Sequence, residues 1–194
     1  MPTWRKWLRL NSEKNINLDN EIKKSEFLGK WIDLLDSREL DFLIDKYNLE
    51  VIFYPHRHMQ KDLDAFSHVN KKIIIGSSED YEIQDLLKTS ELMITDYSSV
   101  FFDMIYMKKP IIFYQFDEDE FRKFHYGKGY FDYHNNAFGN AFSEYKQVVS
   151  ELERLIEQHY IVSSEYQKEH SMIFPYYDMR NSERIYEYLV KNGD

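Results

Sequence analysis

The chain has no cysteine among its 194 residues, which excludes a disulfide framework and a metal site built on thiolates. Long apolar runs are missing as well. The runs Ile73–Ile75 and Ile111–Tyr114 are far shorter than the ~20 residues that a membrane-spanning helix needs, and no signal-peptide pattern is present. We therefore expect a soluble domain without a membrane span, suited to a reducing cytoplasm.

Basic residues are fewer than acidic ones, 25 against 34, and the net charge is −9. A surface of this charge opposes binding to a polyanion, so nucleic acid is not an expected partner. Any phosphate site must therefore be small and formed by local groups, such as a helix N-terminus or a few basic side chains. The length favours a single domain over residues 1–194, and the hydrophobic content of 43% is enough for a substantial core.

Short apolar runs alternate with longer stretches of helical spacing, a pattern typical of a parallel sheet with crossover helices. Because the expected strands are apolar throughout, both faces of the sheet should be covered. The predicted fold is α/β, a doubly wound parallel sheet. The expected strands are 50–54, 72–75, 92–95 and 110–114, and the expected helices are 25–47 (as one helix or two, broken near Ser37), 83–88, 98–107, 118–124, 143–159, 164–172 and 181–191.

The first five residues, from Met1 to Arg5, look like the exit of a strand, whereas a doubly wound domain usually begins with one. We therefore expect the chain to be part of a larger protein, with the first strand of the sheet missing. A missing strand would leave an edge or slot open. The polar stretch 11–20 is predicted to be a loop, and the aromatic stretch 116–142 is too irregular to form one element.

The most informative motif is Thr95-Asp96-Tyr97-Ser98-Ser99, which leads from an apolar strand into a helix. Ligands bind at the carboxyl ends of strands in open α/β sheets, and a first helical turn offers free backbone N–H groups. Ser98 and Ser99 can therefore form an anion cradle, and Asp103 could accept hydrogen bonds from donor hydroxyls. The alternative is that Asp96 or Ser98 simply caps the helix.

A second expected strand ends in Pro55-His56-Arg57-His58. In a parallel sheet this strand end should lie at the same edge as the turn with Ser98 and Ser99. His56 could donate a hydrogen bond or a proton to a phosphate, and Arg57 could neutralise its charge. The alternative of a zinc site at His56 and His58 is weak, because no acidic or thiolate partner is nearby in the sequence. The acidic run 117–120 more often faces water at a helix start than binds Mg²⁺. No metal site is predicted.

These motifs together resemble the CDP-glycerol glycerophosphotransferase family of teichoic acid polymerases and primases. The resemblance covers residues 2–188 and is strongest at Thr95-Asp96-Tyr97-Ser98-Ser99. It also includes Pro2 to Arg5, Asp85-Leu86-Leu87, Phe102-Asp103, Lys109 to Tyr114 with Asp117, the strand-terminal His56 and the aromatic segment Gly127 to Tyr133.

The resemblance implies a Rossmann-like domain, the C-terminal half of a GT-B fold, that holds the activated donor. By position, His56 looks like the family's donor-phosphate histidine and acts in catalysis, whereas Ser98, Ser99 and Asp103 look like donor contacts. Arg5, Arg57 and Lys128 would add positive charge to the donor site. Lys128 stands where the family commonly has arginine, so its phosphate contact would lack a bidentate fork.

The function that the resemblance implies is transfer of a polyol phosphate from CDP-glycerol or CDP-ribitol to a lipid-linked polymer, for a teichoic acid or capsule, with no cofactor. The family places the acceptor base in an N-terminal domain, so we expect this chain to bind donor without turnover, in a protein peripheral to the inner face of the cell membrane. The alternatives are a GT-B glycosyltransferase that uses a nucleotide sugar, and a non-catalytic interaction module with the same fold.

Overall fold

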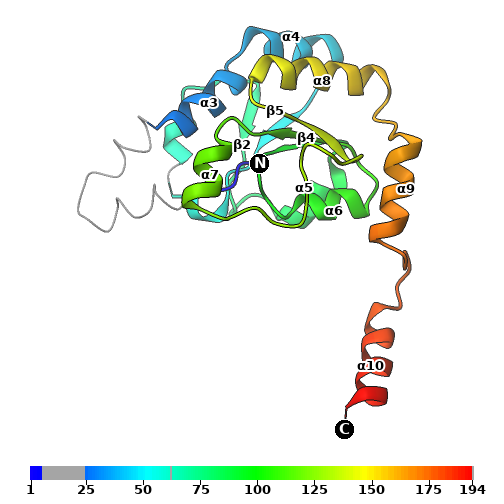
Figure 1. The fold of residues 1–194 in the computed structure, drawn as a ribbon. Helices are drawn as coiled ribbons and strands as arrows, with labels where there is room; N and C mark the ends of the chain where they lie inside the picture. The colour runs from blue at the N-terminus through cyan, green and yellow to red at the C-terminus, as the bar shows by residue number, and fades with distance from the viewer. Residues whose placement is uncertain (6–24, 62, 194) are drawn as a thin grey trace, which may run out of the picture.

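The computed structural model describes residues 1–5, 25–61 and 63–193, so the loop predicted at 11–20 lies outside the described residues. The described part is a layered α/β structure with parallel strands between helices (Figure 1). The predicted α/β architecture is confirmed. The strands are β1 (Val51–Phe53), β2 (Ile73–Ile75), β3 (Met93–Thr95), β4 (Ile111–Tyr114) and β5 (Gly139–Phe142).

The helices cover the ranges that the apolar spacing predicts, with shifted ends. Ser37 ends the ambiguity over 25–47: its Oγ accepts a hydrogen bond from the N–H of Leu40 at 3.2 Å, so a second helix begins there. The helices are α3 (Glu26–Leu35), α4 (Arg38–Tyr47), α5 (Ile83–Thr89), α6 (Phe101–Tyr106), α7 (Glu118–Phe124), α8 (Tyr145–Glu157), α9 (Ser164–Ile173) and α10 (Asn181–Asn192), with short 3-10 turns η1 (Arg57–Met59) and η2 (Leu63–Phe66).

The strands belong to two parallel sheets instead of one continuous sheet. In the described residues β1 pairs with β2, and β4 lies between β3 and β5. Strand β5 was not predicted, because Gly-Asn-Ala-Phe lacks a β-branched run. Its glycine is required by the pairing: a Cβ on Gly139 would clash with the carbonyl oxygen of Ile111 on β4.

The core has two parts, one on each face of β4. Ile112 and Tyr114 join the cluster under α3, α4 and α8, whereas Ile111 and Phe113 join the cluster with α6 and α9. All four side chains are buried, as expected for a strand covered on both faces. Figure 1 shows α3, α4 and α8 on one side of the sheets and α5 and α6 on the other.

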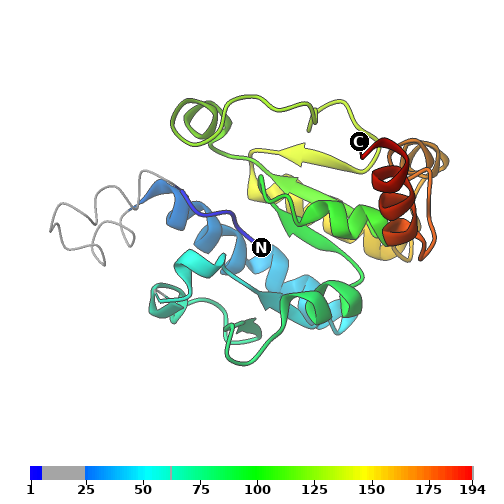
Figure 2. The same cartoon turned by 90° about the horizontal axis from the view of Figure 1, so that it is seen from below.

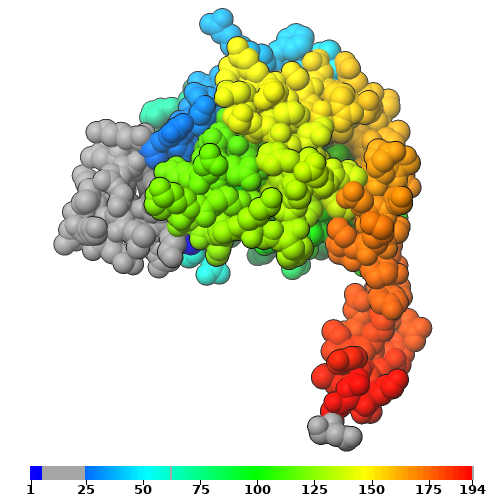
Figure 3. Space-filling view, viewed as in Figure 1, coloured from blue at the N-terminus to red at the C-terminus, as the bar shows by residue number. Residues whose placement is uncertain are grey.

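The carboxyl-terminal helix α10 projects away from the body (Figure 3). None of its residues is buried. The opposite end of the chain lies inside: Figure 2 shows the amino terminus between the two sheets.

Candidate functional site

Residues 1–5 form an extended segment that lies along the end of β3. The Met1 amine donates a hydrogen bond to the carbonyl oxygen of Ile94. The Oγ1 of Thr95 donates to the Met1 carbonyl oxygen at 2.7 Å, and the N–H of Thr3 donates to Oδ1 of Asp96 at 2.8 Å. This segment therefore forms part of the rim at the carboxyl ends of the parallel strands, where ligands bind in open α/β sheets.

Asp96 is fully buried at this rim. Its carboxylate accepts hydrogen bonds from the N–H groups of Thr3 and Tyr97 and from Nη1 of Arg5, at 2.8, 2.6 and 2.9 Å. The side-chain amide of Gln115, after β4, donates to the Asp96 carbonyl oxygen at 3.0 Å. Asp96 thus connects the ends of β3 and β4 with the first five residues, and it does not cap α6.

Arg5 was predicted to contact a donor, and the structure gives it a different position. Its side chain is 0% exposed, and the guanidinium bridges Asp96 and Asp117, with Nε at 2.7 Å and Nη2 at 2.9 Å from the Asp117 carboxylate. Burial alone would lower the pKa of Arg5, but the two carboxylates outweigh it and raise that pKa. Arg5 therefore holds Asp96 and Asp117 in place at the rim, and its guanidinium is not accessible to a ligand.

His56 follows β1 and is half-buried. Its Nδ1 accepts a hydrogen bond from the N–H of His58 at 3.2 Å, so the neutral ring carries its proton on Nε2. Burial, followed by the charges of His58 and Arg57, lowers the pKa of His56, although Asp96 acts in the opposite direction. His56 is thus a neutral hydrogen-bond donor near pH 7, and the exposed Arg57 beside it adds positive charge.

Trp4 connects His56 with the α7 side of the rim. Its ring centroid lies 6.4 Å from that of His56, 5.0 Å from that of His58 and 4.9 Å from that of His125, which follows α7. The sequence did not identify Trp4 or His125 as site residues, because no spacing rule relates positions 4, 56 and 125. The hydrogen bonds and ring contacts of residues 1–5 bring together the ends of β1 and β3.

The two serines stand between β3 and α6, which begins at Phe101 and not at Ser98 as predicted. Ser98 is 7% exposed and Ser99 is exposed. Their carbonyl oxygens accept hydrogen bonds from the N–H groups of Phe101 and Phe102 at 3.2 and 3.1 Å. No side-chain hydrogen bond caps α6 within the described residues. Asp103, in the first turn of α6, is exposed.

Lys128 lies apart from these residues in an exposed loop after α7. The charge of Lys128 acts on Asp132, whose pKa is lowered mainly by hydrogen bonds from Asn135 and His134.

Arg122 is a cation of the rim that the sequence did not single out. Its guanidinium carbon lies 5.4 Å from the ring centroid of Tyr97 and 5.5 Å from that of Tyr133, and its Nε lies 3.5 Å from Glu118. Tyr97 in turn stacks on Phe121 at 3.9 Å. Aromatic rings with Arg122 against them therefore lie next to the turn with Ser98 and Ser99.

Two residues of the acidic run after β4, Asp117 and Glu118, form ion pairs. Asp117 pairs with Arg5, and Glu118 lies 2.7 Å from Nε2 of His134. Across residues 1–5, 25–61 and 63–193, no group of three or more His, Asp or Glu side chains is arranged to hold a metal ion. None of the helices in this part of the chain is long and apolar enough to cross a membrane.

The chain matches one protein family over nearly its whole length. The model of the CDP-glycerol:poly(glycerophosphate) glycerophosphotransferase family matches residues 1–191. The chain is 29% identical over 194 residues to the minor teichoic acid biosynthesis protein GgaB of Bacillus subtilis (strain 168), which covers 98% of the chain but only 21% of GgaB. It is 30% identical over 132 residues to a teichoic acid poly(glycerol phosphate) polymerase of Bacillus spizizenii, covering 64% of the chain and 28% of the polymerase.

The fold has a counterpart among solved structures. A structure of the wall teichoic acid polymerase TagF aligns with 98% of the chain and 42% of its own, with a TM-score of 0.59 and 24% sequence identity. This likeness supports the fold. The chain spans about a fifth to two fifths of the length of these relatives.

Proposed function

The chain belongs to the CDP-glycerol:poly(glycerophosphate) glycerophosphotransferase family, and from this premise we propose that it is the domain that binds the CDP-polyol donor of a teichoic acid polymerase or primase. In this proposal the polyol is glycerol or ribitol, the polyols named for two of its relatives, and no cofactor takes part. The acceptor, a lipid-linked polymer at the inner face of the cell membrane, is bound by other parts of the protein.

The observation that supports this proposal is the path of residues 1–5. Met1 and Thr3 are hydrogen-bonded to Thr95 and Asp96 at the end of β3, and the Trp4 ring lies 6.4 Å from that of His56, which follows β1. We propose that His56 and the turn with Ser98 and Ser99 contribute to one donor site. The rim offers groups that suit a pyrophosphate. The Nε2–H of His56 and the serine hydroxyls are donors, and Arg57 supplies charge in a protein whose net charge is −9. Asp103 would accept hydrogen bonds from the polyol or ribose hydroxyls.

The chemistry assigns these donors to the leaving group. An acceptor hydroxyl attacks the β-phosphorus of CDP-glycerol, a new P–O bond forms, and the bond between the β-phosphorus and the bridging oxygen breaks to release CMP. The proton of the acceptor hydroxyl goes to a base outside this chain. His56 and the two serines stabilise the charge that develops on the CMP phosphate. The chain alone should therefore bind donor without turning it over.

Calorimetric titration of the chain with CDP-glycerol, CMP and UDP-glucose tests the proposal. We expect binding of CDP-glycerol and CMP but not of UDP-glucose. His56→Ala should weaken CDP-glycerol binding by about tenfold or more, the loss of one hydrogen bond to a charged group. The matched control is His68→Ala, which removes an exposed histidine that follows η2. It should bind CDP-glycerol like the wild type.

Two outcomes would reject parts of the proposal. A preference for UDP-glucose would reject the CDP-polyol donor and favour a nucleotide-sugar transferase. Equal affinities of the wild type and His56→Ala would remove His56 from the phosphate site.

A further inference from the structure

The two arginines of the rim differ in how their N–H groups are used. The guanidinium of Arg5 has two carboxylates within 2.9 Å. In Arg122, Nε is buried and has no hydrogen-bond partner in the described part of the chain, because Glu118 is 3.5 Å away. Its Nη1 donates to the Gly127 carbonyl oxygen at 3.4 Å, which is also long. Since a guanidinium has five N–H groups, Arg122 keeps donors for a ligand.

Three aromatic rings fix the position of the Arg122 guanidinium. Its central carbon lies 5.4, 5.8 and 5.5 Å from the ring centroids of Tyr97, Phe121 and Tyr133. Tyr97 and Phe121 are buried and stack on each other at 3.9 Å, whereas the Arg122 side chain is 21% exposed. An arginine that packs on ring faces keeps its N–H groups available. The guanidinium is therefore ordered before a ligand binds, which lowers the entropy cost of binding.

A row of ring contacts relates Arg122 to His56. Arg122 contacts the ring of Tyr97, the residue directly before the serine turn. His56 is joined to this ring through three others. The centroid distances along the row are 6.4, 4.9, 4.7 and 3.9 Å, and the row runs from His56 through Trp4, His125 and Phe121 to Tyr97. Arg122 and His56 are therefore at opposite ends of the row.

Tyr133 connects the Arg122 end of this row with α6. Its ring centroid lies 5.8 Å from that of Phe101, the first residue of α6, and Asp103 is in the first turn of the same helix. In the proposed function the serine turn holds the CMP phosphate and Asp103 binds the polyol hydroxyls. The transferred phosphate lies between these two parts of CDP-glycerol. Arg122 lies beside both the serine turn and the start of α6, where this phosphate would be.

We propose that Arg122 binds the β-phosphate of the CDP-polyol, the phosphate that is transferred, and so makes the domain prefer a CDP-polyol over CMP. This inference rests on the proposed function. Two N–H groups of the guanidinium donate to two phosphate oxygens, a contact that the ammonium of Lys128 cannot make. Glu118 gives up its 3.5 Å contact with Arg122 and keeps the 2.7 Å contact with Nε2 of His134. During attack by the acceptor, the same N–H groups stabilise the charge on the transferred phosphate.

Calorimetric titration with CDP-glycerol and with CMP tests this role. Both ligands carry about two negative charges near pH 7, so a change in the overall charge of the protein affects both alike. Arg122→Gln removes the charge and the paired N–H groups, and Arg122→Lys keeps the charge alone. The control, Lys123→Gln, removes an exposed charge from the same helix. Partial unfolding of a variant lowers the number of sites for both ligands and leaves the ratio of their affinities unchanged.

We expect Arg122→Gln to weaken CDP-glycerol binding about tenfold or more and CMP binding less than about threefold. Arg122→Lys should lie between Arg122→Gln and the wild type, and Lys123→Gln should keep both affinities. A wild-type ratio of affinities in Arg122→Gln would overturn the role of Arg122, as would a wild-type ratio in Arg122→Lys if Arg122→Gln did not fold. A wild-type chain that did not bind CDP-glycerol would instead reject the proposed function, and this inference with it.

Discussion

Asp96 and Arg5 hold the rim together through charges that have no contact with water. Arg5→Met would leave the buried carboxylate of Asp96 and the partly buried one of Asp117 without their counter-charge. We expect this variant to lose about 3–5 kcal/mol of unfolding free energy, the usual effect of removing one partner of a buried pair, in urea denaturation. Arg180→Met, which removes an exposed pair with Glu183, is the control and should unfold like the wild type. An Arg5→Met midpoint equal to that of the wild type would contradict the structural role of Arg5.

The lowered pKa of His56 makes stability depend on pH in a definite direction. Because the unfolded chain binds a proton at His56 at a higher pH than the folded chain, the free energy of unfolding decreases as the pH falls below about 6.5. His56→Gln removes this contribution, so its melting temperature should fall less than that of the wild type between pH 7.5 and pH 5.5. His68→Gln, at an exposed position, should keep the wild-type slope. A wild-type slope for His56→Gln would show that His56 protonates equally in both states.

At the residue scale, the sequence predicted where residues lie relative to the strands better than it predicted which side chains they contact. His56, Ser98 and Ser99 follow apolar strands, and a local pattern is enough to locate them at strand ends. Arg5 pairs with residues 91 and 112 positions away, and no local pattern encodes such a distance. Its charge suggested a ligand contact, whereas the nearby ends of β3 and β4 supply two carboxylates that bury it.

At the scale of elements, a methyl group added at a glycine has opposite effects in β5 and in α3. Gly139→Ala places a Cβ against the Ile111 carbonyl oxygen where β5 pairs with β4, and we expect it to lower the free energy of unfolding by about 1–3 kcal/mol or more. Gly29→Ala in α3 meets nothing within 4 Å and should raise it by about 0.5–1 kcal/mol, because alanine favours a helix. Denaturant midpoints check both. Stabilisation by Gly139→Ala would mean that β5 does not pair closely with β4.

Element prediction succeeded where burial and propensity agree. β4 is apolar at every position because both of its faces are covered, so its sequence could not be mistaken for a loop. β5 has no buried residue and an unfavourable composition, and its strand conformation comes from pairing with β4, a contact between distant parts of the chain.

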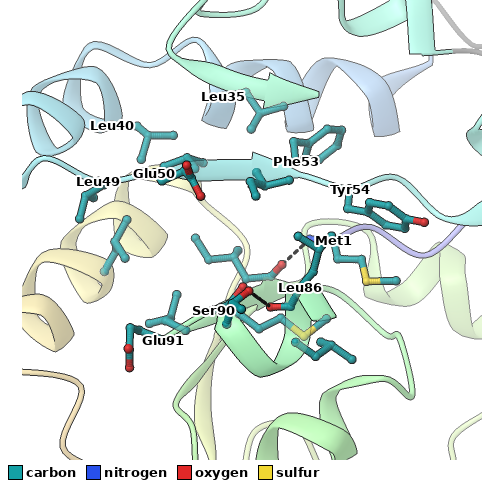
Figure 4. Close-up of a pocket in the computed structure, with 18 of the residues that line it drawn as sticks. Met1, Leu35, Leu40, Leu49, Glu50, Phe53, Tyr54, Leu86, Ser90 and Glu91 are labelled. Carbon is teal, nitrogen blue, oxygen red and sulfur yellow. Dashed lines mark hydrogen bonds between the residues drawn. The ribbon is translucent and has the colours of Figure 1, made fainter. Parts of the chain in front are cut away.

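At the scale of the molecule, the division into two sheets could not be derived from strand patterns. β1 to β4 all have an apolar composition, so their patterns do not show that β1 and β3 lie in different sheets in the described residues. The open slot expected from the strand-exit character of residues 1–5 stays a prediction; the structure shows a cavity of about 520 Å³ lined by residues of β1 and β3 (Figure 4).

The position of α10 leads to a prediction about the whole chain. α10 has no buried residue, and its large apolar side chains are 61–68% exposed, at Ile185, Tyr186, Tyr188, Leu189 and Val190. Since none of its residues is buried and its apolar side chains stay mostly exposed, a chain that ends at Arg180 should melt within about 2 °C of the full chain by circular dichroism. A chain that ends at Ser163 also loses α9, where Tyr166 is buried and donates to the Lys109 carbonyl oxygen at 2.8 Å. It should melt several degrees lower or lose its cooperative transition. A large drop already at Arg180 would mean that α10 packs on the body in solution, with its apolar residues covered.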